Sequence, residues 1–178
     1  MQTRSLKVSK NTALLQLYTV FYLLPSIFSS RPETQIWSVW IFLSTTITGF
    51  IVNHYDSPEQ KNATPLQSTW VARTSKLEGV ATLTGLILGS FLHAWWIFGT
   101  LITGAATLHF ISLSLAYKRH LDFLATIIGG SAFLLTLIHI PPSLWDDWAF
   151  AGGLLAGITL NYSYVLWSSK NNRTSTHR

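Results

Sequence analysis

The sequence contains no cysteine among its 178 residues. Disulfides, catalytic thiolates, thiolate-ligated zinc and iron–sulfur clusters are therefore excluded. The chain also lacks a glycine-rich phosphate loop and any nucleotide-binding motif. Any chemistry that it performs must therefore depend on carboxylates, imidazoles and hydroxyls.

Charge is scarce as well. Only 11% of the residues are Asp, Glu, Lys or Arg, whereas 48% are hydrophobic. Soluble domains carry about 25% charged residues, so the composition predicts an all-α integral membrane protein. The formal charge of +5 is assigned to cytoplasmic loops, and no nucleic-acid partner is expected.

Long apolar runs predict the membrane spans, because a helix needs about 20 mostly apolar residues to cross the hydrocarbon. The sequence predicts a compact bundle of six transmembrane helices in a single polytopic domain, residues 1–178. The predicted spans are 13–29, 35–52, 77–96, 98–117, 123–140 and 148–167.

The stretch from Leu77 to Tyr117 has almost no charge over about forty residues. A single helix of that length would measure about 60 Å, roughly twice the hydrocarbon thickness. The chain must therefore turn, and the segment His93-Ala94-Trp95-Trp96 is the predicted position of the turn.

The basic residues orient this bundle. Eleven of the twelve Lys and Arg residues fall on one side of a six-span arrangement, and only Arg31 falls on the other. The positive-inside rule then places both termini and the loop 53–76 in the cytoplasm. This loop is predicted to be a connector, and the polar tail 168–178 to be disordered. The expected location is the endoplasmic reticulum in a eukaryote and the inner membrane in a bacterium.

Ionisable residues near the outer ends of spans form the first candidate site, because such residues are costly in a membrane. They are His93, His139, Asp146 and Asp147. Packed together, these side chains would supply a general acid and a general base beside Trp95, Trp96, Trp145 and Trp148. Alternatively, the aspartates only cap a helix and the tryptophans only form an interfacial belt.

Other candidates are predicted elsewhere in the spans. Glu78 opens the third span at its cytoplasmic end, as Asp122 opens the fifth. His109 lies about 17 Å from the outer end of the fourth span, at a depth similar to that of Asn161. Glu78 and His109 are candidate catalytic residues. The structural alternative is that the carboxylates cap helices and that His109 hydrogen-bonds a neighbouring helix.

No cofactor and no metal are expected. A bis-histidine haem site needs two imidazoles at one depth, and no second histidine pairs with His109 in the sequence. Two glycine pairs, Gly85 with Gly89 and Gly153 with Gly157, predict close helix contacts. These contacts would lie either inside the chain or in a homo- or hetero-oligomer.

Two short segments, Ala72-Arg73-Thr74 and His109-Phe110, resemble the small endoplasmic-reticulum scaffold protein of ergosterol biosynthesis. The resemblance covers about a third of the chain. That family has an acidic residue soon after the His-Phe pair, where this chain has Ser112 and Ser114, and it has fewer spans. The resemblance implies a scaffold without catalytic activity.

The sequence favours a small membrane-embedded biosynthetic enzyme that acts by cofactor-free acid–base chemistry on a terpenoid- or polyketide-like substrate. Cyclisation, isomerisation or epoxide opening would need only acid–base groups in a dry cavity. The second hypothesis is a scaffold or complex subunit, for example in lipid or sterol biosynthesis. A transporter is third, because no inverted repeat is evident. Membrane lipids and a lipophilic small molecule are the expected partners.

Overall fold

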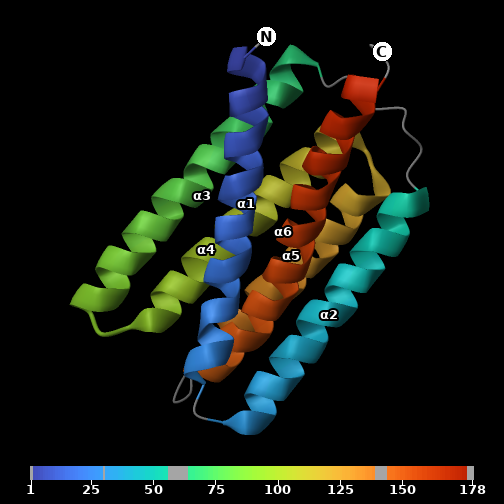
Figure 1. The fold of residues 1–178 in the computed structure, drawn as a ribbon. Helices are drawn as coiled ribbons and strands as arrows, with labels where there is room; N and C mark the ends of the chain where they lie inside the picture. The colour runs from blue at the N-terminus through green and yellow to red at the C-terminus, as the bar shows by residue number, and fades with distance from the viewer. Residues whose placement is uncertain (1, 30, 56–63, 139–143, 176–178) are drawn as a thin grey trace.

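The computed structural model describes residues 2–29, 31–55, 64–138 and 144–175, with side chains described at 12–29, 31–55, 64–138 and 148–167. Within these ranges the chain forms helices and no strand, so the all-helical prediction is confirmed (Figure 1). The helices are α1 (Gln2–Phe28), α2 (Pro32–Tyr55), α3 (Pro65–Phe91), α4 (Trp95–Tyr117), α5 (His120–Ile138) and α6 (Leu144–Ser175).

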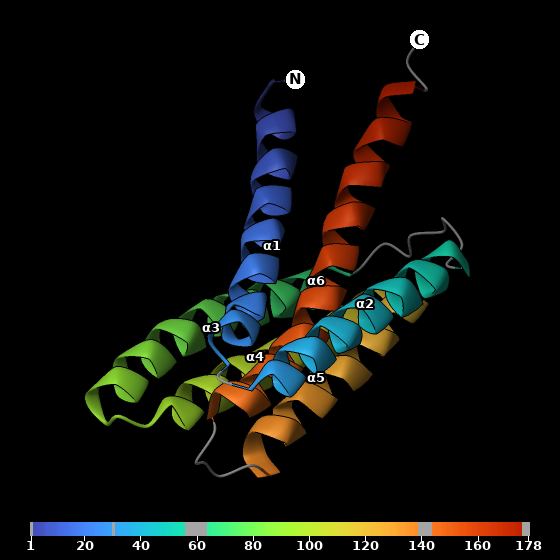
Figure 2. The same ribbon diagram turned by 60° about the horizontal axis from the view of Figure 1, so that its bottom comes forward.

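Successive helices run in opposite directions, and the chain begins and ends at the same end of the bundle (Figure 1). Helix α6 packs against α1, α2 and α5, while α4 packs against α3 and α5. The start of α1 and the end of α6 extend beyond the other helices (Figure 2). In the described part of the chain, the backbone of α3 approaches only α4, so the backbones of α1 and α3 stand apart. The cleft is the space lined by α1 side chains from Leu14 to Phe28 and by Thr82 and Leu86 of α3.

Four helical segments are long and apolar enough to cross a membrane, as expected of a membrane protein. They are Pro32–Tyr55, Trp95–Tyr117, His120–Ile138 and Trp148–Trp167. The apolar part of α1, Thr12–Phe28, is shorter. Helix α3 carries Lys76 directly before the predicted third span and Glu78 within it, and it is not among the four.

The predicted turn between the third and fourth helices is confirmed. Helix α3 ends at Phe91 and α4 begins at Trp95. His93 has a φ of 52°, in the left-handed region that histidine tolerates better than most residues. The amide of Ala94 donates to the carbonyl of Gly89 at 3.0 Å, which closes the turn.

The prediction of a connector over 53–76 is wrong at both ends. Helix α2 continues to Tyr55, and α3 begins at Pro65 with a capping box. The Thr64 hydroxyl accepts from the Gln67 amide at 3.3 Å, and the Gln67 side chain accepts from the Thr64 amide at 2.9 Å. Pro65 suggested a loop, but proline is favoured at the first position of a helix.

The predicted disordered tail 168–178 is also wrong over most of its length, because α6 continues to Ser175. The segment 168–175 contains neither glycine nor proline. Starting a helix is costly, because several residues must be fixed for the first hydrogen bond. Extending an existing helix fixes one residue for each new hydrogen bond, so polar composition alone does not end it.

Both glycine pairs lie inside the bundle. A methyl group at Gly85 would lie 2.9 Å from the Phe98 backbone of α4, and one at Gly153 would lie 2.7 Å from the Ser38 carbonyl oxygen of α2. Asn161 reinforces the α2–α6 contact by donating to the Thr46 carbonyl at 3.2 Å. These glycines therefore serve close packing within one chain.

Candidate functional site

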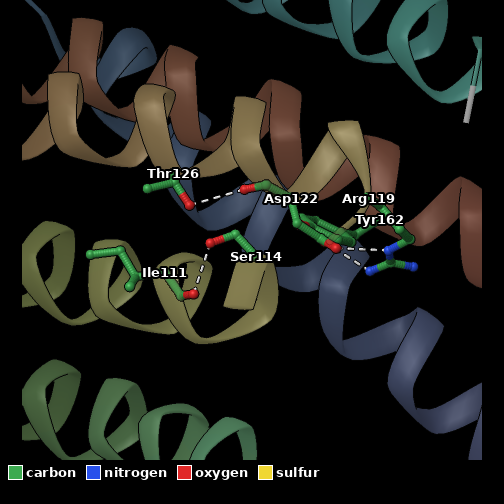
Figure 3. A network of polar contacts seen from close by, with 6 residues as sticks. All are labelled: Ile111, Ser114, Arg119, Asp122, Thr126 and Tyr162. Atoms are coloured by element: carbon green, nitrogen blue, oxygen red, sulfur yellow. Dashed lines mark hydrogen bonds and ion pairs between the residues drawn. The ribbon is translucent and has the colours of Figure 1, made fainter. Parts of the chain in front are cut away.

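Asp122, at the start of α5, is a fully buried carboxylate with a complete set of partners (Figure 3). Arg119 donates to both of its oxygens at 2.8 Å, and the Tyr162 hydroxyl donates to Oδ1 at 2.6 Å. The Arg119 guanidinium also lies 5.8 Å from the centre of the Tyr162 ring. This network connects the α4–α5 turn to α6, so the structural interpretation of Asp122 fits best.

Glu78, on α3, has a different environment. It is half-buried, and the hydroxyl of Tyr22 on α1 donates to its Oε1 at 3.1 Å. The Glu78 carboxylate forms no ion pair with any base in the described part of the chain. Its one side-chain partner is therefore a neutral hydroxyl, and this hydrogen bond joins two helices whose backbones stay apart.

Two apolar cavities lie along the α1 side of this cleft. The first, about 160 Å³, is the aromatic hollow. Its lining residues are Phe21, Leu24, Pro25, Phe28, Leu86, Trp95, Phe98, Gly99 and Trp148. The second, about 330 Å³, is the aliphatic hollow. Its lining residues are Leu14, Leu17, Tyr18, Val20, Phe21, Leu24 and Thr82.

Glu78 does not line either hollow, but its immediate partners adjoin both. The Thr82 hydroxyl donates to the Glu78 carbonyl at 2.8 Å, and Thr82 lines the aliphatic hollow. The Tyr22 ring lies 6.4 Å from the ring of Trp148, which lines the aromatic hollow. Glu78 is thus linked to the aliphatic hollow through Thr82, and to the aromatic hollow through Tyr22 and Trp148.

His109 takes part in a separate polar contact between α3 and α4. Its Nδ1 lies 3.2 Å from the Thr74 hydroxyl, which lies 2.8 Å from that of Ser112. Asn161 instead bonds the backbone of α2, so the two residues predicted at one depth engage different helices. The contact does bring together Thr74 and His109, which belong to the two segments of the scaffold resemblance.

The outer cluster predicted from the sequence is only partly described. His93 lies exposed in the α3–α4 turn. His139 and the side chains of Asp146 and Asp147 lie outside the described residues, so this cluster stays a prediction. Two of the tryptophans expected to wall it, Trp95 and Trp148, line the aromatic hollow.

Tyr22 is the main residue that sequence reasoning missed. It is 1% exposed, and its hydroxyl supplies the only side-chain hydrogen bond to the Glu78 carboxylate among the described residues. A signal was present in the apolar run of the first span, which Gln16, Tyr18 and Pro25 interrupt. Of these residues, Gln16 is exposed, whereas Tyr18 is half-buried and lies one turn before the buried Tyr22, so Tyr18 was the useful signal.

Among the described side chains, no three His, Asp or Glu residues gather closely enough to hold a metal ion together. No family model matches the chain, and the comparisons with curated proteins and with solved structures gave no match. The function must therefore be argued from the geometry of the cleft.

Proposed function

We propose that this chain is a polytopic membrane enzyme that binds a lipophilic substrate in the cleft between α1 and α3, where Glu78 acts as the general acid. The observation that carries the proposal is the setting of Glu78. This carboxyl has one neutral hydrogen-bond donor and no ion pair in the described part of the chain, and Thr82, one turn further along α3, lines the aliphatic hollow. A side chain that only stabilised the fold would be expected to have partners like those of Asp122.

The chemistry follows from the hydrogen bond. A carboxyl without a counter-ion is least costly to bury as the neutral acid. Tyr22 occupies Oε1, which leaves Oε2 to carry the proton. Oε2 would deliver this proton to an alkene carbon, an epoxide oxygen or a carbonyl oxygen of the substrate, leaving a carboxylate. The Glu78 carboxylate then removes a different proton from the cationic intermediate, which regenerates the acid and completes an isomerisation or cyclisation without a cofactor.

The aromatic hollow suits the intermediate of such a reaction. The rings of Phe98 and Trp148 lie 5.5 Å apart, and Phe21 meets Phe98 edge to face at 5.9 Å. Aromatic faces attract a positive charge without reacting with it, and apolar walls exclude water that would trap it. These features support acid-initiated chemistry on a hydrocarbon.

The test is conversion of lipophilic precursors by microsomes that contain the chain. Glu78→Gln keeps the shape of the side chain but cannot deliver the proton, so turnover should fall by about 10²–10⁴-fold. Glu33→Gln, at an exposed carboxylate, is the matched control and should be active. If instead Asp146→Asn or Asp147→Asn abolished turnover while Glu78→Gln did not, the acid would belong to the outer cluster, with Asp147 the stronger candidate.

We propose further that the six helices are all membrane spans, with both termini in the cytoplasm. The distribution of basic residues and the alternating helix directions support this topology. Because the chain has no native cysteine, a cysteine introduced at Ser175 reports the side directly. In sealed microsomes, whose cytoplasmic face points outward, it should react with a membrane-impermeant maleimide, and labelling only after the membrane is opened contradicts the topology.

A scaffold is the second candidate function, and one observation favours it. The Thr74–His109 hydrogen bond joins the two segments that resemble the ergosterol scaffold protein. Copurification of a defined set of biosynthetic enzymes, lost in Thr74→Val but retained in Glu78→Gln, would support the scaffold over the enzyme.

A further inference from the structure

We infer that Phe21 sets the length of the hydrocarbon chain that the cleft accepts, and that the ligand is a linear apolar chain. This inference rests on the ligand site of the proposed function and names its specificity-determining residue. Phe21 and Leu24 are the two residues that line both hollows. Leu14 to Val20 lie on one side of this pair along α1, and Pro25 and Phe28 lie on the other. The hollows therefore lie end to end, with Phe21 and Leu24 as the partition.

Phe21 forms the inner part of the partition. Its ring reaches from α1 to the Phe98 ring of α4, where the two meet edge to face at 5.9 Å and 89°. Leu24 is 37% exposed and so contributes the outer rim. Removing the Phe21 ring would join a cavity of about 160 Å³ to one of about 330 Å³.

The aromatic hollow is the deeper of the two cavities. The buried residues Phe98, Gly99 and Trp148 wall it, whereas Leu14, Leu17 and Val20 of the aliphatic hollow are exposed. A chain bound in the aromatic hollow therefore ends against Phe21. Because the two hollows follow one another along α1, their arrangement matches a linear chain better than a compact fused-ring ligand.

This geometry predicts how affinity depends on chain length. Each additional buried CH₂ group contributes about 0.8 kcal/mol, which corresponds to about fourfold in affinity. In the wild-type protein the gain should stop once the chain reaches Phe21. In Phe21→Ala the gain should continue at up to about fourfold per CH₂ group, until the aliphatic hollow is filled as well.

The experiment measures binding of diazirine-bearing linear alcohols from hexanol to octadecanol to the full-length protein in detergent, with mass spectrometry to locate the labelled residues. We expect an affinity plateau for the wild type, a plateau at longer chains for Phe21→Ala, and one at shorter chains for Phe21→Trp. Phe123→Ala, which removes the same ring from α5 at a position that lines neither hollow, should keep the wild-type plateau. Phe21→Leu, a smaller truncation, serves if the alanine variant does not fold.

The outcomes separate the two proposals. An unchanged plateau in Phe21→Ala or Phe21→Leu, with labels still in the cleft, overturns the role of Phe21 and leaves the ligand site intact. Absence of cleft labelling in the wild type overturns the ligand site and the inference together. A shifted plateau combined with normal turnover of Glu78→Gln overturns only the acid role of Glu78.

Discussion

Asp122 and Glu78 are the two carboxyls that the described part of the chain places within the bundle, and their surroundings differ in kind. Asp122 is fully buried with Arg119 and Tyr162 as partners, whereas Glu78 is half-buried with the Tyr22 hydroxyl alone. A buried charge stays in a fold when paired donors compensate it, as at Asp122. The Glu78 carboxyl has only one neutral donor among the described residues, so it is the better candidate of the two to act on a ligand.

Stability should separate the two carboxyls most clearly. Asp122→Ala removes the carboxylate that accepts from the Arg119 guanidinium and the Tyr162 hydroxyl. Because Arg119 is 20% exposed and can regain water, we expect a loss of about 3 kcal/mol in the free energy of unfolding, the lower end for a broken buried pair. Glu78→Ala should cost about 1 kcal/mol. Unfolding by dodecyl sulfate titration measures both, and an equal cost for the two variants would contradict the comparison.

The helix that carries Tyr22 offers the next contrast. A methyl group at Gly152 of α6 would collide with the Tyr22 carbonyl oxygen, whereas one at Gly130 of α5 would meet nothing within 4 Å. Because the obstacle at Gly152 is backbone, Gly152→Ala should destabilise the fold by about 2–3 kcal/mol. Gly130→Ala should be neutral or stabilise by up to about 1 kcal/mol, since alanine favours the helix. The dodecyl sulfate titration measures both variants. If Gly152→Ala were as stable as the wild type, α1 would not pack against α6 at Gly152 as the structure has it.

Tyr162 and Tyr22, which donate hydrogen bonds to Asp122 and Glu78, should give smaller changes in stability when they are mutated. Tyr162→Phe removes a buried hydrogen bond to a charged acceptor and should cost about 2 kcal/mol of stability. Tyr22→Phe should cost about 1 kcal/mol but lower turnover about tenfold, because Oε1 of Glu78 loses its donor. Unfolding and turnover assays on both variants test this division. Loss of turnover in Tyr162→Phe at normal abundance would assign a role in catalysis to the Asp122 network.

His109 provides the smallest predicted effect. His109→Ala removes the contact with Thr74 and should cost about 1 kcal/mol and harm function more than His120→Ala, which changes an exposed side chain. The control is Thr74→Val, which should reproduce the loss if the hydrogen bond is responsible. If His109→Ala functions like the wild-type protein at an equal protein level, His109 has no role beyond packing in the bundle.

Sequence reasoning succeeded where one local rule decides the outcome. The length of the uncharged stretch after Leu77 required a turn near Trp95, and the structure has one there. It failed where capping overrides composition, because Pro65 starts a helix that polar residues appeared to exclude. It missed Tyr22 because its hydrogen bond to Glu78 spans 56 positions of sequence, and no local pattern encodes which residues of two such distant helices meet.

The central claim is that Glu78 is a neutral acid with the Tyr22 hydroxyl as its partner, in contrast to the charged and paired Asp122. A hydrophobic carbodiimide measures this directly, because it partitions into apolar sites and reacts only with protonated carboxyls. Treatment of the full-length protein in membranes, followed by peptide mass spectrometry, should show modification at Glu78, suppressed by the diazirine-free alcohols that bind the cleft, and no modification at Asp122. Modification at Asp122 with none at Glu78 would contradict the account.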